Sequence, residues 1–386
     1  MNRMSFGLFV PPHHRLGENP TLAMRRVIEL IEYCDQLGFD EAWVGEHHST
    51  GHEIIADPTL ILAAAAERTK RIKLGPGVVS LPYHHPFMVA DRIVQLDHMS
   101  MGRAMLGVGP GALISDADMM GIHPSTQRPR MNEALGVIVE LLKGNVVTHK
   151  SDWFEVREAQ LQLAPYRPEG IPIAVASTTS PSGVTSAGQY GLGVLALGAG
   201  LIGGKKNLAE QWRIAEETAA KYDQVVDRRE WRPVLRVHLA EDRDEAIRDV
   251  VKARQIERDQ YFKPLLGLSN DFTLEQEIED GTLIIGTPDD AIRVISDMYE
   301  SSGGFGCFLI LAHEWASTPK TMHSLELFAR YVMPHFQNSL DAPRASADFL
   351  IRKRPGYKDI ATQAIAQAYT DSGRDLPDGL DIHKVR

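Results

Sequence analysis

The sequence predicts an α/β protein: a (β/α)₈ TIM barrel with insertions at its C-terminal face and a C-terminal extension. Three observations support this fold class. Short β-rich runs alternate with longer helical patterns, as they do in parallel βα units. Eight such runs occur, which is the number that closes a barrel. The runs are almost continuously apolar, which is typical of strands that are covered on both faces.

Each expected strand is bounded by glycine, proline or polar residues. In chain order the expected strands are Ser5–Val10, Phe39–Gly45, Ile72–Ser80, Ala104–Gly109, Ile171–Ala176, Leu192–Leu197, Val234–Ala240 and Phe305–Leu311. Helical periodicity fills the intervals, and in the first of them Val27, Ile31 and Cys34 recur at helical spacing before Gly38 ends the pattern. The main helices are expected at Thr21–Leu37, Pro58–Arg68, Pro86–His98, Arg130–Leu142, Pro288–Ser301 and Lys320–His335, with another opening around Ser180–Ser182.

Three segments fall outside this repeat. Ala112–Arg128 interrupts the fourth βα unit, Asn145–Pro165 has the pattern of a β-hairpin, and Phe262–Ile285 is a long acidic stretch. Long loops at the C-terminal face of a barrel often act as lids, so we expect Phe262–Ile285 to be one. The apolar face of this lid would consist of Phe262, Leu265, Leu266 and Leu268. We expect one barrel domain over 1–336, followed by a charged tail over 337–386 that is not a separate domain.

Composition limits the classes of partner. The chain has 386 residues, of which 43% are hydrophobic and 24% charged, and its formal net charge is −10. An acidic chain repels phosphates, which argues against a nucleic-acid or anionic-membrane partner. No apolar run approaches the ~18 residues of a membrane helix, and a cytoplasmic enzyme is expected. Cys34 and Cys307 lie in apolar stretches and are expected to be buried, unpaired thiols.

Histidine pairs follow the first three expected strands, at His13–His14, His47–His48 and His84–His85. Functional residues of a barrel lie at these strand ends. One interpretation is a metal site, because imidazole is a common zinc ligand. The other is a polar rim around an organic cofactor, with one histidine transferring protons. The metal interpretation is weaker, since neighbouring residues at a strand end point in opposite directions and each pair offers one inward ligand.

The segment Ala176–Ser182, after the fifth strand, combines hydroxyl side chains with the start of a helix. Hydroxyls, free amides and a helix N-terminus together can hold a phosphate. An ordinary N-cap by Ser180 with Pro181 at the first helical position explains the same pattern, and the sequence leaves both open. Glycine clusters at Gly75–Gly77 and Gly107–Gly111 predict a flat ligand lying against bare main chain. The second is not a dinucleotide fingerprint, because its spacing is wrong and Pro110 would block the next helix.

Taken together, these runs resemble the luciferase-like monooxygenase family. The resemblance covers about residues 4–336 and rests on FDEAWVGEHH, IKLGPGVVSLPYHHPFMVADRIVQLDHMSMGR, AMLGVGPGA, IIGTPDDAIRVI and ELFARYVMPHF. The sequence around SLPYHHP and GVGPGAL is similar to that of the limonene-monooxygenase-like branch of the family. The resemblance implies an enzyme that takes reduced FMN from a separate, transiently bound reductase and reacts it with O₂. A flavin hydroperoxide would then oxygenate a small apolar substrate such as a terpene or ketone, and a homodimer is implied.

The resemblance also assigns roles by position. His47 matches the catalytic histidine, and the Gly77–Val78 bond matches a non-proline cis peptide beside the flavin ring. Gly109 and Pro110 stand where the luciferase catalytic subunit has a cysteine and a phosphate-binding arginine. The expected phosphate contacts are Ser177, Thr178, Thr179 and Ser182, and the residues expected to assist with phosphate or substrate are Arg130, His14 and His85.

Three alternatives stay open on the sequence alone. One is a non-catalytic relative that binds FMN and releases all oxygen as peroxide. A deazaflavin-dependent dehydrogenase could use the same barrel without oxygen. Less favoured is a metallohydrolase that uses the histidine rim, although no metal ligand is assigned.

Overall fold

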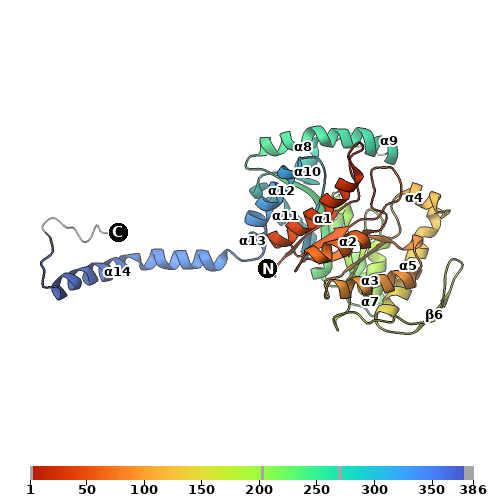
Figure 1. Ribbon diagram of the computed structural model, residues 1–386, viewed down its shortest axis with the longest axis horizontal. Helices are drawn as coiled ribbons and strands as arrows, with labels where there is room; N and C mark the ends of the chain where they lie inside the picture. The colour runs from red at the N-terminus through yellow and green to blue at the C-terminus, as the bar shows by residue number, and fades with distance from the viewer. Residues whose placement is uncertain (1–2, 201–203, 268–271, 378–386) are drawn as a thin grey trace. The chain divides into compact units, whose positions relative to one another are not determined.

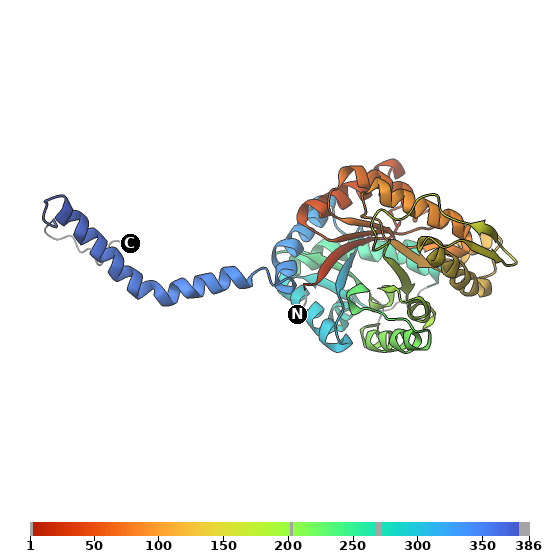
Figure 2. The same cartoon turned by 90° about the horizontal axis from the view of Figure 1, so that it is seen from below.

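The structure is a computed structural model that describes residues 3–200, 204–267 and 272–377. Contacts between Cα atoms divide the chain into two compact units, Met1–Phe336 and Gln337–Arg386. The first unit has its strands at the centre and its helices around them (Figures 1 and 2). The expected (β/α)₈ fold is therefore confirmed.

Parallel strands form the wall of the barrel. Their bounds are β1 (Ser5–Val10), β2 (Glu41–Val44), β3 (Lys73–Pro76), β4 (Val79–Ser80), β5 (Leu106–Gly109), β8 (Ile173–Ser177), β9 (Gly193–Ala196), β10 (Trp231–Leu239), β11 (Leu283–Gly286) and β12 (Cys307–Leu311). Along the sheet the order is β3, β2, β1, β12, β10, β9, β8, β5 and β4. A parallel bridge from Leu74 to Ala104 brings the two ends of this order together, so the sheet curls into a nearly closed barrel.

Helices cover the outside of the wall. The longer ones are α1 (Pro20–Leu37), α2 (Pro58–Arg68), α3 (Pro86–Met99), α5 (Pro124–Leu142), α6 (Ser182–Tyr190), α7 (Gly204–Lys221), α8 (Arg243–Glu257), α11 (Pro288–Ser302) and α12 (Thr318–Leu327). Local signals fix their ends. The Asn19 side chain accepts a hydrogen bond from Thr21 N at the start of α1, and Gly38 ends it in the left-handed conformation. Helix α5 begins six residues before the expected start, at Pro124.

Shorter elements complete the barrel unit. They are η1 (Leu81–Tyr83), α4 (Ile114–Met119), η2 (Leu197–Gly200), η3 (Arg228–Glu230), η4 (Arg258–Phe262), α9 (Lys263–Leu266), α10 (Leu274–Asp280), η5 (Phe328–Val332) and α13 (Met333–Phe336). The expected hairpin is present as antiparallel β6 (Val147–Lys150) and β7 (Glu155–Ala159). Cys34 and Cys307 are buried and unpaired, as expected.

The expectation for Phe262–Ile285 was wrong at its C-terminal end. Residues from Leu283 form β11, which pairs in parallel with β10 from Arg236 to Leu239. The run TLIIG is only five residues long and follows a charged helix. Its local sequence therefore does not distinguish a strand from part of an acidic loop. Part of the expected lid is therefore a strand of the barrel sheet, and Leu268 lies outside the described residues.

The second unit contains a 31-residue helix, α14 (Asp341–Asp371), that the sequence did not predict. Pro355 lies inside it and Gly356 follows, a pair that normally indicates a helix end. None of the described residues of α14 is buried. No described helix of either unit has the length and apolar character needed to cross a membrane.

The described part of the barrel unit contains three buried apolar clusters, two of which bear on the position of the site. The larger lies between the sheet and the helices, with Phe6, Leu8 and Ile31 among its buried members. The smaller fills the barrel axis and is built around Phe9, Trp43, Met105, Leu195 and Leu309. Because the axis is filled with side chains, it is a core and not a channel. A ligand bound inside the barrel would therefore lie above this core, at the mouth of the barrel.

Candidate functional site

A cavity of about 310 Å³ opens at the mouth of the barrel, at the carboxyl ends of the strands. Its wall comes from the ends of β1, β2, β4, β5, β8 and β9 and from the start of α5 and α6. Six of the residues singled out in the sequence line it: His47, Gly77, Val78, Gly109, Thr178 and Ser182. The tertiary structure thus brings together residues that are up to 135 positions apart in the chain.

The floor of the cavity is main chain without large side chains. The Gly77–Val78 peptide bond is cis, as the resemblance implied. A Cβ atom on Gly109 would lie 2.7 Å from Val78 Cγ2, and one on Gly77 would lie 2.9 Å from Phe9 Cε2. Both glycines are thus required by close packing and also leave the cavity floor bare. This arrangement suits a flat ring system.

Two other glycines of the same clusters have a different role. Gly75 and Gly107 are not among the described residues that line the cavity. A Cβ atom on Gly75 would meet the Trp43 ring at 2.8 Å, and one on Gly107 would meet Pro76 O at 2.2 Å. These two positions serve strand packing around Trp43 and not ligand approach, which corrects part of the interpretation of the glycine clusters.

One end of the cavity is the loop between β8 and α6. Helix α6 begins at Ser182 after Pro181, and among the described residues no side chain caps its first amides. Ser180 Oγ hydrogen-bonds Ser182 Oγ at 2.9 Å instead of capping the helix. An uncapped helix N-terminus beside two hydroxyls is suited to bind an anion. This geometry favours the phosphate interpretation over the ordinary N-cap.

Two of the expected phosphate contacts lie elsewhere. Thr179 is exposed and is not among the described lining residues, whereas Thr178 is. Ser177 is buried below the loop, and its Oγ has no hydrogen-bond partner among the described residues. The alternation of side chains along an extended segment explains why neighbouring hydroxyls do not share one surface.

The cation at the cavity is Arg128 and not Arg130. Arg128 lines the cavity, whereas the Arg130 guanidinium lies 5.3 Å from the centre of the Trp153 ring. Residues two apart on a helix point in nearly opposite directions, so only one of them can face the cavity. The sequence expectation failed because it placed the start of α5 at Arg130.

His47 lies between two carboxyl groups. Its Nδ1 is 2.9 Å from Asp116 Oδ2, and its Nε2 is 3.5 Å from Glu53 Oε1. Burial by itself would raise the pKa of Asp116, but hydrogen bonds from His47 and Ser49 outweigh that effect and lower it. Asp116 belongs to α4, inside the insertion Ala112–Arg128. Neither carboxyl group directly follows a strand, so the strand-end pattern in the sequence does not indicate Glu53 or Asp116 as site residues.

The second member of this histidine pair faces a different group. Glu46 Oε1 lies 2.9 Å from His48 Nε2 and 2.8 Å from His84 Nε2. Glu46 Oε2 accepts a hydrogen bond from Ser80 N at 3.0 Å. Burial by itself would raise the pKa of Glu46, but these hydrogen bonds have the larger effect and lower it to about 2. The carboxylate therefore holds the ends of β2 and β4 together. His48 and His84 are structural members of the rim.

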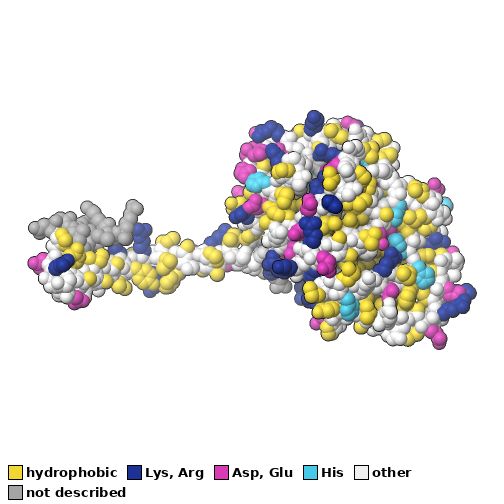
Figure 3. All heavy atoms as spheres, viewed as in Figure 1, with side chains coloured by type: hydrophobic (Ala, Val, Ile, Leu, Met, Phe, Trp, Pro, Cys, Tyr) yellow, Lys and Arg dark blue, Asp and Glu magenta, His cyan; other side chains and the backbone are white. Residues whose placement is uncertain are grey.

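The expected helpers His14 and His85 do not line this cavity, as far as the described residues show. His85 is exposed, and its Nε2 lies 3.4 Å from Glu155 O at the start of β7. His14 is buried, and its Nδ1 lies 2.9 Å from Glu314 Oε1. Histidine side chains also reach the surface at several places on the face shown in Figure 3, where acidic, basic and apolar groups are interspersed.

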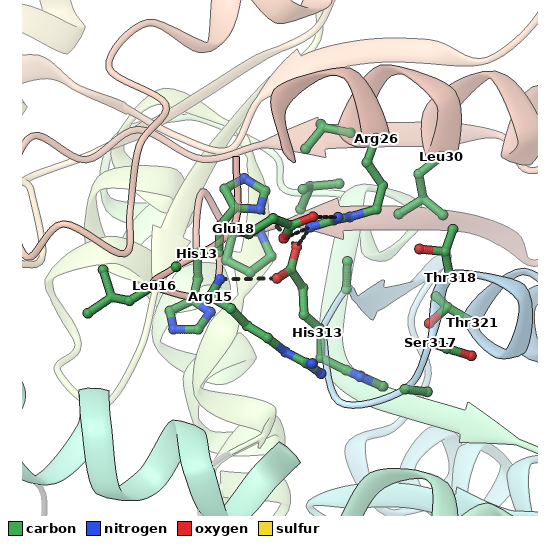
Figure 4. Close-up of a pocket in the computed structure, with 18 residues that line it drawn as sticks. His13, Arg15, Leu16, Glu18, Arg26, Leu30, His313, Ser317, Thr318 and Thr321 are labelled. Atoms are coloured by element: carbon green, nitrogen blue, oxygen red, sulfur yellow. Dashed lines mark hydrogen bonds and ion pairs between the residues drawn. The ribbon is translucent and has the colours of Figure 1, made fainter. Parts of the chain in front are cut away.

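His14 lines a second cavity of about 400 Å³, between the end of β1 and the helices α1 and α12. Figure 4 shows Glu18 and Arg26 facing each other there. Glu314 accepts hydrogen bonds from Arg26 and from the Arg15 amide. Burial would raise the pKa of Glu314, but hydrogen bonds from His14 and Arg26 lower it to about 2. Glu18, Arg26, Glu314 and His14 are therefore paired with one another in this cavity.

The helical turn just before the segment expected to be a lid packs against the histidines through one residue. Tyr261, on η4, is 5% exposed, and its ring lies 4.6 Å from His13 and 5.3 Å from His52. Its hydroxyl contacts Glu53. Leu265, which was expected on the apolar face of the lid, is 46% exposed. Within the described ranges, no group of three or more His, Cys, Asp or Glu side chains is arranged to hold a metal ion.

Comparison with known proteins agrees with this geometry. A family model described as luciferase-like monooxygenase matches residues 4–304. The chain is 45% identical over 377 residues to 4-hydroxyprotoasukamycin monooxygenase of Streptomyces nodosus subsp. asukaensis, covering 95% of this chain and 99% of the relative. It is 47% identical over 346 residues to limonene 1,2-monooxygenase of Rhodococcus erythropolis, covering 88% of each.

Among solved structures, the chain resembles the oxygenating constituent of 3,6-diketocamphane monooxygenase from Pseudomonas putida, a type II Baeyer-Villiger monooxygenase in complex with FMN. The TM-score is 0.73 and the sequence identity 27%, and the match covers 86% of this chain and 98% of that chain.

Proposed function

The chain belongs to the luciferase-like monooxygenase family, and on that premise we propose that it is a two-component monooxygenase. It would take reduced FMN from a separate reductase and use it with O₂ to oxygenate a small apolar organic molecule. The single observation that carries this proposal is one cavity that combines a bare glycine floor, an uncapped helix N-terminus and His47.

The residues of the cavity fit FMN at both ends. We assign Gly77, Val78 and Gly109 to the surface beneath the ring system. Thr178 and Ser182 would bind the phosphate together with the first amides of α6, and Arg128 would neutralise its charge. Ser177 and Thr179 are left out of this set because they do not line the cavity. When bound, reduced flavin supplies the electrons that activate O₂.

The rest of the site would exclude water and handle protons. Phe9, Pro12 and Leu197 line the cavity with apolar surface, which limits the access of water to the reacting atoms. We propose that His47 is the catalytic residue, and that its imidazole takes up or releases a proton at a group bound in the cavity. The flavin hydroperoxide implied by the resemblance stays a prediction, as do the homodimer and the transient reductase complex.

The relatives indicate a substrate class. Their printed names refer to limonene, diketocamphane and 4-hydroxyprotoasukamycin. We propose that the substrate is a terpene or ketone similar in size to limonene or diketocamphane, with limonene as the first compound to test. The type of oxygen insertion is left to experiment.

The test supplies the purified protein with photoreduced FMN, ¹⁸O₂ and limonene or a bicyclic ketone, and mass spectrometry follows the label. We expect one labelled oxygen atom in the organic product. Release of all the oxygen as hydrogen peroxide, with every compound of both classes unchanged, would contradict oxygenation of this substrate class. Reduction of a deazaflavin by a secondary alcohol without O₂ uptake would favour the dehydrogenase instead.

A further inference from the structure

Gln211 is a polar residue on the buried face of α7. Leu208, Trp212 and Ala215 share this face and belong to the larger apolar cluster, and Gln211 itself is only 7% exposed. A buried amide needs partners for both its oxygen and its nitrogen if its burial is not to cost free energy. The Oε1 of Gln211 has no partner among the described residues. Stability alone therefore does not explain a glutamine at this position.

The hydrogen bond that this side chain does make reaches the loop between β8 and α6. Gln211 Nε2 donates to Thr178 O at 2.7 Å. The same oxygen lies close to the main chain of η2, because a Cβ atom on Gly198 would be 2.4 Å from it. The Thr178 carbonyl is thus enclosed by α7 and η2, and this restricts the direction in which it points.

Little else holds this part of the loop. Residues 178–180 make no backbone–backbone hydrogen bond within the described structure. The hydroxyl of Ser180 bonds that of Ser182, which is only two positions away. Yet Thr178, Ser180 and Ser182 all line the cavity. The contact with Gln211 is therefore the one described hydrogen bond that connects residues 178–180 to a distant part of the chain.

Holding a carbonyl in one direction also holds the conformation of the residue that carries it. The direction of Thr178 C=O sets the ψ angle of this residue, and the planar peptide bond then sets where the next residue begins. Gln211 thereby controls how the Thr178 hydroxyl lies relative to the start of α6. A phosphate binds more tightly to donors that already have this arrangement, because they lose less freedom on binding.

We propose that Gln211 is a positioning residue for the phosphate of bound FMN. Gln211 does not line the cavity, so it acts through Thr178, which it holds in the arrangement that receives the phosphate. In this way a side chain on the outer helix α7 determines the preference of the site for FMN over riboflavin, which lacks the phosphate. The inference rests on the proposed function, since it takes FMN to be the ligand of this cavity.

The first test follows the loop without measuring activity. Thr178–Thr179 is the one Thr–Thr pair in the sequence, so protein labelled with ¹³C-carbonyl threonine and ¹⁵N threonine gives a single signal in an HNCO spectrum. This signal reports the Thr178 carbonyl directly. In flavin-free protein we expect Gln211→Met to shift it, because the carbonyl loses its donor. An unchanged signal in a folded Gln211→Met protein would overturn the positioning role.

The second test compares two ligands by fluorescence titration. In Gln211→Met the Kd of FMN should rise about 5- to 10-fold, the effect of one lost hydrogen bond. The Kd of riboflavin should change less than about 2-fold, because the ring is held by other residues. Gln211→Asn, whose shorter side chain does not reach Thr178 O, should behave in the same way and replaces Gln211→Met if that variant folds poorly. An equal change for both ligands would mean that Gln211 only supports the fold, and the proposal would fail.

Gln127 provides the matched control. It is also buried, at 6% exposed, and its Nε2 donates to the main-chain oxygen of Pro110 at 2.9 Å. Pro110 lines the cavity beside Gly109, on the part of the wall assigned to the ring. Gln127→Met removes a contact of the same kind and should change the Kd of FMN and of riboflavin by the same factor.

Two outcomes separate this inference from the proposed function. If the wild type binds riboflavin as tightly as FMN, the phosphate site of the proposed function fails, and the role of Gln211 fails with it. If the wild type prefers FMN and Gln211→Met keeps the whole of that preference, the role of Gln211 is wrong while the proposed function stands.

Discussion

Glu41 and Arg232 form a two-point ion pair on the barrel axis, with Nε to Oε2 at 2.7 Å and Nη2 to Oε1 at 3.0 Å. The residues are 4% and 2% exposed. The Trp43 indole N–H also donates to Glu41 at 3.0 Å. This pair lies at the start of β2 and β10, in the opposite half of the barrel from the cavity. It forms a polar layer below the apolar core. Glu41 belongs to the run FDEAWVGEHH, but nothing in that run indicates Arg232 as its partner.

Removing one partner of this pair should destabilise the protein strongly. Glu41→Gln removes the buried counter-ion of Arg232 and leaves only the half-exposed Glu230 beside it, so we expect a loss of about 3 kcal/mol in the free energy of unfolding. Urea denaturation of the flavin-free protein measures it. Arg213→Ala, at an exposed ion pair of α7, serves as the control and should change the free energy of unfolding far less, because exposed ion pairs contribute little. Equal effects of the two substitutions would contradict this account.

Loss of the His47 imidazole should lower turnover and spare flavin binding. We expect His47→Ala to reduce oxygenation about 10²- to 10⁴-fold, the range for positioned proton transfer. The FMN Kd should change little, because the ring and the phosphate are held by other residues. Product formation and fluorescence titration with FMN measure the two quantities. Near-normal oxygenation by this variant would remove His47 from the catalytic role.

Arg128 and Arg130 offer a matched comparison. Arg128→Ala should weaken FMN binding about 10-fold, since a charge-assisted hydrogen bond contributes about 1.5 kcal/mol or more. Arg130→Ala should change the Kd less than about 2-fold, because its side chain packs on Trp153 instead. Riboflavin, which lacks the phosphate, should bind both variants like the wild type. The opposite ranking of the two variants would restore the original sequence expectation.

Glu46 should make the stability of the barrel depend on pH in the acid range. Its pKa in the folded protein is about 2, below the ordinary value of 4.5. A depressed carboxyl pKa stabilises the folded state above 4.5, and this contribution disappears as pH falls toward 2. We expect the stability difference between the wild type and Glu46→Gln to shrink by up to about 3 kcal/mol.

Urea denaturation at intervals from pH 5.5 to 2 measures that difference. His48, the partner whose pKa the Glu46 contact raises, stays protonated throughout this range and so does not obscure the result. A difference that is independent of pH would show that the contacts of Glu46 do not favour its charged form.

Much of the fold and part of the site could be predicted from local sequence. Eight apolar runs predicted the barrel wall, and the strand ends carried His47, Gly77, Gly109 and Thr178 to one mouth. These predictions succeeded because a parallel barrel collects the carboxyl ends of all its strands on one face. The same local signals could not show whether Arg128 or Arg130, or whether Thr178 or Thr179, lines the cavity. The direction in which a side chain points depends on where its helix or strand begins.

The amino-acid sequence by itself determined the barrel, the resemblance to a flavin-using family and the histidine of the site. Only the tertiary structure decided which acidic groups surround that histidine, that Glu41 pairs with Arg232, and that Leu283–Gly286 is a strand. The physical reason is the separation in sequence of the interacting residues, because periodicity and capping reflect interactions between residues only a few positions apart. The contacts of His47 with Asp116 and of Glu41 with Arg232 join positions 69 and 191 residues apart.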